Sequence, residues 1–221
     1  MTATAYQTAK VQYYNSQNNL REAQKAEIIE ITRDAFSRPP WNYSPLELQT
    51  QRIASAIEYA HSMPTATVIT VESGDKILGY RLVLNMDDVV AHSSPSLKPL
   101  LNELSEKIPA FPKNISYTEV LAVNPTHHNN GVGSKLIDAH IAYAAANGHD
   151  FILGWTKPGS SVMITRYEAR GYKPLEGMKV RNGISIDSSP SRRGFVIDPD
   201  SSGQAIFYLK DLRPLREAAR A

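Results

Sequence analysis

The sequence predicts a single α/β domain of the α+β type, with one sheet flanked by helices. The first observation is a series of short segments rich in β-branched residues, two of which, residues 65–72 and 77–86, are joined by the turn Ser73-Gly74-Asp75. The second is helical spacing of apolar residues elsewhere, as in the stripe Leu136, Ile137, His140, Ile141 and Ala144. The third is composition: 42% hydrophobic and 21% charged residues over 221 positions suffice for one hydrophobic core.

Each element follows from its local pattern. Strands are predicted where β-branched and aromatic residues gather between turn residues, at 10–14, 65–72, 77–86, 115–123, 150–156, 178–186 and 204–209. Helices are predicted where apolar residues recur every three or four positions, at 20–36, 45–62, 95–108, 133–147 and 160–169. Residues 212–221 are expected to form a short surface helix or a tail. Pro39, Pro64 and Pro109 end the helices before them, because proline lacks an N–H. Residues 187–203 are rich in Ser, Pro and Asp and are expected to form a loop.

Composition also excludes several functions. The 24 basic and 22 acidic residues give a net charge of +2, too balanced to predict a nucleic-acid or membrane partner. The absence of cysteine excludes a disulfide scaffold, a thiol nucleophile and a Cys-ligated zinc site. No apolar run approaches the roughly 20 residues that span a bilayer, and residues 1–10 lack the features of a signal peptide. We therefore expect a soluble, cytoplasmic protein.

The most informative segment is the loop His128-Asn129-Asn130-Gly131-Val132-Gly133-Ser134, which lies between a predicted strand and a predicted helix. The first turn of a helix has N–H groups without intrahelical partners, and the helix dipole adds partial positive charge there. Glycine lets the backbone approach a pyrophosphate closely and adopt positive φ. The loop is therefore predicted to bind an anion.

Two other interpretations of this region fail. A dinucleotide-binding motif would need a third glycine where Leu136 stands, and an acidic residue at the end of the next strand, where Trp155 and Thr156 stand. The pair His127-His128 suggests a metal site, but adjacent residues rarely face one ion and no third ligand is evident. We predict no metal site.

Residues 117–175 resemble the GNAT superfamily of acyl-CoA N-acyltransferases. The segment Leu121-Ala122-Val123-Asn124-Pro125 looks like the family's Leu-Ala-Val-x-Pro strand end, and the loop looks like its Arg/Gln-x-x-Gly-x-Gly/Ala motif, with His128 in place of the Arg or Gln. The segment from Thr165 to Tyr172 is similar to its Phe-Tyr-x-x-x-Gly-Phe element, and Pro-Pro-Trp-Asn at residues 39–42 is similar to a loop of some bacterial members.

The resemblance implies a mixed, mostly antiparallel twisted sheet with a V-shaped splay between two parallel strands, here residues 115–123 and 150–156. It implies one GNAT domain over residues 1–221, with a coenzyme A-binding core at about 115–175. It also implies acetyl-CoA as the acyl donor. Leu121, Ala122 and Val123 would pair with the pantetheine arm through their backbone, and the pyrophosphate would lie on the N–H groups of the loop, at His128, Asn129, Asn130, Gly131, Val132, Gly133 and Ser134.

The same resemblance suggests the groups that move protons. Tyr167 occupies the family's tyrosine position and is the candidate acid for the departing thiolate; packing is its alternative role. Glu119 is the candidate base, because strand alternation places it on the face of Leu121 and Val123. A solvated carboxylate or an ion pair is the alternative for Glu119. Trp41 is either a wall of the amine site or a core residue.

We therefore predict an N-acetyltransferase that transfers an acetyl group from acetyl-CoA to a primary amine of a small molecule by direct attack in a ternary complex. The alternatives are a protein lysine or N-terminal acetyltransferase, and a non-catalytic acyl-CoA-binding or sensor domain, since one fold hosts many functions. Residues 87–113 are an insertion that could cap the acceptor cleft or form a homodimer face.

Overall fold

The computed structural model describes residues 6, 8–39, 41, 43, 50–180, 183–187, 194–197 and 205–219. The chain divides into two compact units, Met1–Val83 with Val120–His140, and Leu84–Glu119 with Ile141–Ala221. The boundary passes through two strands, β3 (Lys76–Asn85) and β4 (Ile115–Val123), and one helix, α6 (Val132–Ala146). The prediction of a single domain over residues 1–221 stays a prediction.

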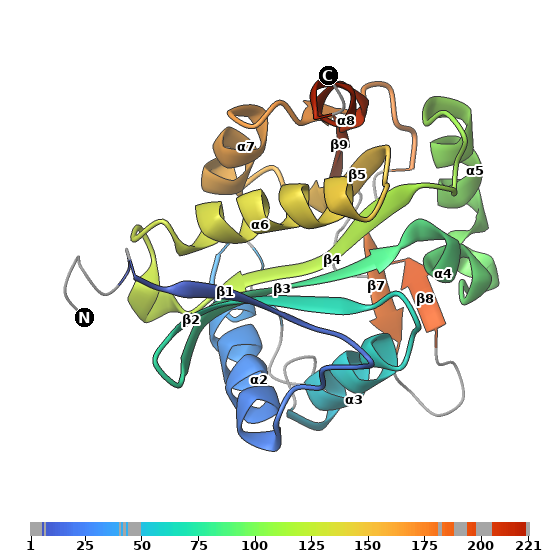
Figure 1. Cartoon of the computed structure of the whole chain (residues 1–221). Helices are drawn as coiled ribbons and strands as arrows, with labels where there is room; N and C mark the ends of the chain where they lie inside the picture. Colours follow the sequence, from blue (N-terminus) through green and yellow to red (C-terminus); the bar gives the residue numbers. More distant parts are fainter. Residues whose placement is uncertain are drawn as a thin grey trace. The chain divides into compact units, whose positions relative to one another are not determined.

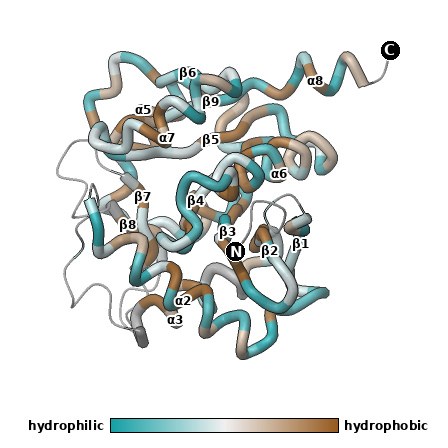
Figure 2. Tube along the Cα trace, turned by 90° about the vertical axis from the view of Figure 1, so that its left-hand side faces the viewer, coloured by the Kyte–Doolittle hydropathy of each residue, from teal (hydrophilic) through white to brown (hydrophobic). Residues whose placement is uncertain are grey.

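In the first unit the strand order is β1-β2-β3-β4. Its elements are β1 (Lys10–Tyr14), α2 (Glu22–Phe36), α3 (Thr50–His61), β2 (Thr67–Ser73), β3 (Lys76–Asn85), and the parts of β4 and α6 that fall within it. β1 and β2 pair antiparallel, and so do β2 and β3, through a turn in which Gly74 has φ of 59°. β2 and β3 are almost wholly buried and are hydrophobic along most of their length (Figure 2).

Different helices cover the two faces of this sheet. Tyr14 Oη donates to Glu72 Oε1 at 2.9 Å and accepts from Gln24 Nε2 of α2 at 2.6 Å. Its neighbour Tyr13 points the other way, and its hydroxyl donates to Ala139 O of α6 at 3.5 Å. Since successive side chains of a strand point to opposite faces, α2 and the start of α6 lie on opposite sides of β1, as Figure 1 shows.

In the second unit the strand order is β4-β5-β9-β6. Its strands in this sheet, besides β4, are β5 (Phe151–Thr156), β6 (Lys173–Pro174) and β9 (Ile206–Asp211). β4 and β5 are parallel, whereas β9 is antiparallel to both β5 and β6. Counted over the described residues, the chain has one mostly antiparallel seven-stranded sheet with a single parallel pair, which confirms the predicted fold class.

The predicted insertion at residues 87–113 packs against a second, two-stranded sheet. The insertion contains α4 (Met86–Ala91), η1 (Pro95–Leu97) and α5 (Lys98–Lys107), and the small sheet pairs β7 (Ile184–Asp187) with β8 (Gly194–Ile197). Phe195 is fully buried; its N–H donates to His92 O at 3.0 Å and its carbonyl accepts from Ser94 N at 2.8 Å. On α5, Glu103 accepts from the backbone N–H groups of Lys179 and Val180. The insertion therefore holds both β8 and the backbone at Lys179 and Val180 in place.

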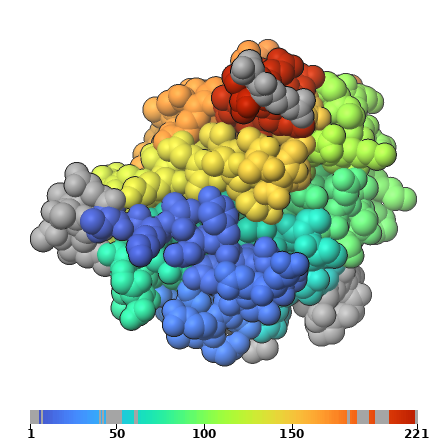
Figure 3. Space-filling model, viewed as in Figure 1, coloured from blue at the N-terminus to red at the C-terminus, as the bar shows by residue number. Residues whose placement is uncertain are grey.

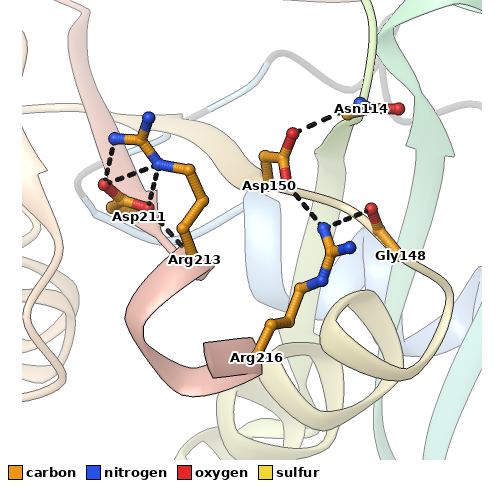
Figure 4. A network of polar contacts seen from close by, with 6 residues as sticks. All are labelled: Asn114, Gly148, Asp150, Asp211, Arg213 and Arg216. Carbon is orange, nitrogen blue, oxygen red and sulfur yellow. Dashed lines mark hydrogen bonds and ion pairs between the residues drawn. The ribbon is translucent and has the colours of Figure 1, made fainter. Parts of the chain in front are cut away.

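The last described helix, α8 (Arg213–Ala218), is joined by hydrogen bonds and an ion pair to the residues just before β5. Arg216 Nη1 donates to Asp150 Oδ1 at 2.5 Å and to Gly148 O at 2.8 Å, and Asn114 Nδ2 donates to Asp150 Oδ2 at 3.2 Å (Figure 4). Next to them, Arg213 binds Asp211 through two nitrogens and holds the pKa of that carboxyl below its usual value. These ion pairs fix the edge at which β4 and β5 begin.

Most predicted elements are present within a few residues of their expected bounds, and α7 (Ser161–Glu168) and β4 are examples. Two predictions were wrong. Residues 178–180 are not a strand, because the backbone N–H groups of Lys179 and Val180 donate to the Glu103 carboxylate instead of to a neighbouring strand. The predicted loop 187–203 contains β8, whose central Phe195 is buried against the insertion. Of the predicted helix at 45–62, residues 45–49 lie outside the described residues. No described helix is both long and apolar enough to cross a membrane.

Candidate functional site

The parallel strands β4 and β5 pair over only part of their length. The register joins Ile115 to Phe151, Ser116 to Ile152 and Tyr117 to Leu153, and it goes no further. Yet β4 continues to Val123 and β5 to Thr156, and the end of β5 stays paired with β9 on its other side. The pairing between the two parallel strands therefore ends after Tyr117 and Leu153, at the place where the family resemblance predicts a splay.

The hydroxyl of Tyr167 lies at the point where this pairing ends. A Cβ built on Gly154, the first β5 residue past the pairing, would be 3.4 Å from Tyr167 Oη. The same Cβ would be 3.5 Å from Cβ and 3.6 Å from Oγ1 of Thr118, the first β4 residue past it. The missing side chain of Gly154 thus leaves Tyr167 Oη and Thr118 facing one small region directly after the last β4–β5 pair.

Tyr167 is held there by other aromatic rings. Its side chain is 2% exposed, and its ring centroid lies 4.7 Å from that of Tyr172 and 5.5 Å from that of Tyr208. Helix α7 ends just after it, where Gly171 has φ of 76° and Tyr172 N donates to Tyr167 O at 3.1 Å. Burial, with a smaller effect of Glu168, raises the pKa of Tyr208 above its ordinary value, so that this neighbour stays neutral. Packing therefore fixes the position of the Tyr167 ring.

Glu119 occupies the opposite face of β4. It follows Thr118, and successive side chains of a strand point to opposite sides. Glu119 is half-buried and its Oε2 atom is buried. Glu119 therefore points to one side of β4, whereas the Tyr167 hydroxyl lies near Thr118 on the other side.

The predicted phosphate loop has the backbone conformation expected of an anion-binding turn. Asn129 and Gly131 both have positive φ, of 62° and 78°. Left-handed residues within a turn direct successive N–H groups toward one side, and such concave turns bind anions. Helix α6 begins directly after Gly131, so its first N–H groups extend the same series. The side chains of residues 128–130 are exposed, whereas Val132 and Gly133 are buried.

His128 contacts the strand rather than projecting freely into solvent. Its Nε2 lies 3.1 Å from Val123 O, and because a carbonyl only accepts, Nε2 carries the proton. Asn130 Nδ2 donates to His128 O at 2.9 Å. The side chains of His128 and Asn130 therefore brace the loop, which leaves the anion contact chiefly to backbone N–H groups. Leu121 and Ala122, the other predicted backbone partners, lie on the same strand, half-buried and buried respectively.

The N-terminal segment also braces this loop, which the sequence did not indicate. Lys135 Nζ donates to Tyr6 O at 2.7 Å and to Ala9 O at 3.3 Å, and Tyr6 Oη shares a hydrogen bond of 3.1 Å with His127 Nδ1. Burial lowers the pKa of His127, which favours the neutral ring in this contact. Figure 3 shows the N-terminal segment beside the first turns of α6.

Gly79 of β3 allows the loop to lie close to the sheet. A Cβ built there would be 2.9 Å from Ala122 O, 3.1 Å from Val123 Cα and 3.0 Å from Val132 Cγ1. Two of these atoms are backbone, so they cannot move without displacing the end of β4. A glycine inside a strand otherwise weakens it, and this close approach explains its presence. The sequence identified the strand but not the need for glycine at this position.

We expect Gly79→Ala to lower both stability and acetyl-CoA affinity, because the added methyl group must displace the end of β4 and Val132. Overpacking of this kind costs about 1–3 kcal/mol. Gly154→Ala is the matched stability control, since its Cβ would make only ordinary contacts. Thermal unfolding of the two variants checks the result. Equal melting temperatures for Gly79→Ala and wild type would contradict the close approach.

Trp41 lies in an aromatic cluster at the C-terminal end of α2. Its ring centroid is 5.1 Å from that of Phe36 and 5.9 Å from that of Tyr43. It is half-buried in this cluster, and its contact with substrate stays a prediction. Residues 40, 42 and 44–49 lie outside the described part of the chain.

Comparisons with known proteins agree with this architecture. The family model described as Acetyltransferase (GNAT) family matches residues 25–172, and the chain therefore belongs to the GNAT acetyltransferase family. A search of curated proteins gives no significant match.

Three solved structures illustrate the likeness of fold. An N-acetyltransferase from Staphylococcus aureus Mu50 is 15% identical, with a TM-score of 0.59, over 92% of this chain and 99% of that one. A ribosomal-protein-alanine N-acetyltransferase from Brucella melitensis is 15% identical, with a TM-score of 0.58, over 92% and 99%. The PaiA N-acetyltransferase from Thermoplasma acidophilum, in complex with coenzyme A, is 11% identical, with a TM-score of 0.56, over 91% and 99%. At these identities the likeness concerns the fold.

Proposed function

We propose that this protein transfers the acetyl group of acetyl-CoA to a primary amine of a small molecule. The observation that carries the proposal is the position of Tyr167 Oη beside Gly154 and Thr118, where β4 and β5 stop pairing. A buried hydroxyl at this point suits a thioester that enters between the strands. The backbone N–H groups of residues 129–134 suit the pyrophosphate, and they need no metal ion to do so.

The proposed reaction is direct acyl transfer. The amine nitrogen attacks the thioester carbonyl carbon, so that a C–N bond forms and the C–S bond breaks. Glu119 takes the proton that the ammonium must lose, directly or through a water molecule. Tyr167 donates a hydrogen bond, and in the limit a proton, to the departing thiolate. A phenol of pKa about 10 is a weaker acid than a thiol of pKa about 8.5, so stabilisation of the thiolate by the hydrogen bond is the larger effect.

The assay that tests the proposal measures thiol release from acetyl-CoA in the presence of a panel of small primary amines, with lysine-containing and N-terminal peptides as a second arm. We expect turnover with at least one small amine. Turnover with peptides alone would favour a protein acetyltransferase. Binding of acetyl-CoA without any turnover would favour a sensor domain. If acetyl-CoA changes neither the melting temperature nor tryptophan fluorescence, the proposal is wrong, because a ligand that binds the native state must stabilise it.

For Glu119→Gln we expect a loss of turnover that depends on pH. The base matters most at low pH, where the acceptor is an ammonium ion, and its contribution shrinks as pH approaches the pKa of the amine. The measurement is kcat/KM against pH for the variant and wild type. Glu106→Gln is the control, because Glu106 is an exposed glutamate on α5. A pH-independent loss would assign Glu119 a structural role instead.

A further inference from the structure

Thr156, the last residue of β5, carries a hydroxyl that the fold does not use. The residue is 2% exposed, and its Oγ1 is buried without a hydrogen-bond partner in the part of the chain that the structure describes. Native proteins keep few such groups, because a buried hydroxyl without a partner loses the hydrogen bonds that it makes with water. Its backbone is paired with Ile206 of β9, so the position of the residue is fixed.

The hydroxyl lies on the face of β5 that carries the proposed acid. Side chains two residues apart in a strand share a face, so Thr156 lies on the face of Gly154. The side-chain position of Gly154 is next to Tyr167 Oη and Thr118 Oγ1. Thr156 is also past the last β4–β5 pair, at Leu153. It therefore lies farther along the same face, at about 6.6 Å for two strand residues.

We propose that Thr156 Oγ1 hydrogen-bonds the amide of the pantetheine arm that lies nearest the thioester. The inference rests on the proposed function, which puts the thioester sulfur at Tyr167. In acetyl-CoA two methylene groups join that sulfur to a secondary amide. The distance from the sulfur to this amide suits the distance along β5 from Gly154 to Thr156. A threonine hydroxyl can donate to the amide carbonyl, and this contact would satisfy the buried group only when the donor is bound.

The proposal predicts opposite effects on the free and the bound protein. Thr156→Val keeps the shape and removes the hydroxyl, so the ligand-free melting temperature should stay the same or rise. The dissociation constant of acetyl-CoA should increase about 3- to 10-fold, the range for one net hydrogen bond. Thr156→Ser, which keeps the hydroxyl, should bind acetyl-CoA within about 2-fold of wild type. Calorimetric titration and thermal unfolding measure both effects.

Titration with the adenosine bisphosphate fragment of coenzyme A, which lacks the pantetheine arm, tests whether Thr156 contacts that arm. Its affinity should be the same for Thr156→Val and wild type. An equal loss for the fragment and for acetyl-CoA would overturn the assignment, because it would indicate a general disturbance. A clear fall in the ligand-free melting temperature would also overturn it, since the hydroxyl would then have a partner in the free protein. If Thr156→Val binds acetyl-CoA like wild type, the inference fails while the proposed function stands. If wild type does not bind acetyl-CoA, the proposed function itself fails.

Discussion

Replacing Tyr167 with phenylalanine is expected to reduce turnover about 10²- to 10⁴-fold, the usual contribution of a positioned acid–base group. The substitution removes only the hydroxyl that lies next to Gly154 and Thr118. The ring and its contacts with Tyr172 and Tyr208 remain, so the affinity for acetyl-CoA should stay within a few-fold of wild type. Steady-state kinetics with the best acceptor and calorimetric titration of acetyl-CoA measure the two quantities.

Tyr208→Phe is the matched control for this result. Tyr208 is 3% exposed and belongs to the same aromatic cluster, and it pairs with Gly154 from β9. Loss of its hydroxyl should leave turnover close to that of wild type. Full turnover in Tyr167→Phe would remove the proposed acid. A comparable loss in both variants would mean that the cluster, rather than one hydroxyl, supports the reaction.

The order of strands and helices could be predicted because the apolar residues follow a clear period in almost every element. β1 has the bounds that its sequence predicts, and so does β4. The loop 128–134 was found for a different reason: glycines directly before a helix indicate an anion site without any knowledge of tertiary contacts. Local patterns therefore identified the family resemblance, and the family match over residues 25–172 confirms it.

What local patterns could not reveal depends on register and on contacts between distant segments. Thr118 and Gly154 face one region only because the β4–β5 register ends just before them. Neither residue belongs to a motif. The bracing of the loop by Lys135 likewise depends on where the chain near Tyr6 lies. The sequence did not predict β8 because Ser, Pro and Asp around it indicate a loop, whereas the structure buries its one aromatic residue, Phe195, against the insertion.

Glycines also show what the sequence alone does not reveal, since three glycines of this chain are required for three different reasons. Gly79 has no room for a Cβ, Gly154 has room but faces the proposed acid, and Gly131 has open space but a left-handed backbone. A substitution therefore disturbs packing at the first, the reaction at the second and the backbone conformation at the third. Only the third could be expected from the sequence, because Gly131 stands in a recognisable loop motif.

At Gly131 we expect that backbone conformation, rather than side-chain bulk, decides acetyl-CoA binding. Its φ is 78°, which a β-branched residue adopts only with strain of about 1–3 kcal/mol, so Gly131→Val should weaken binding about 10- to 100-fold as the loop N–H groups turn away. Asparagine tolerates this region, as Asn129 with φ of 62° already does, so Gly131→Asn should bind better than Gly131→Ala although its side chain is larger. Titration of the three variants gives the order. If affinity instead falls with side-chain size, so that Asn binds worse than Ala, close approach of the ligand explains this glycine and the conformational argument is wrong.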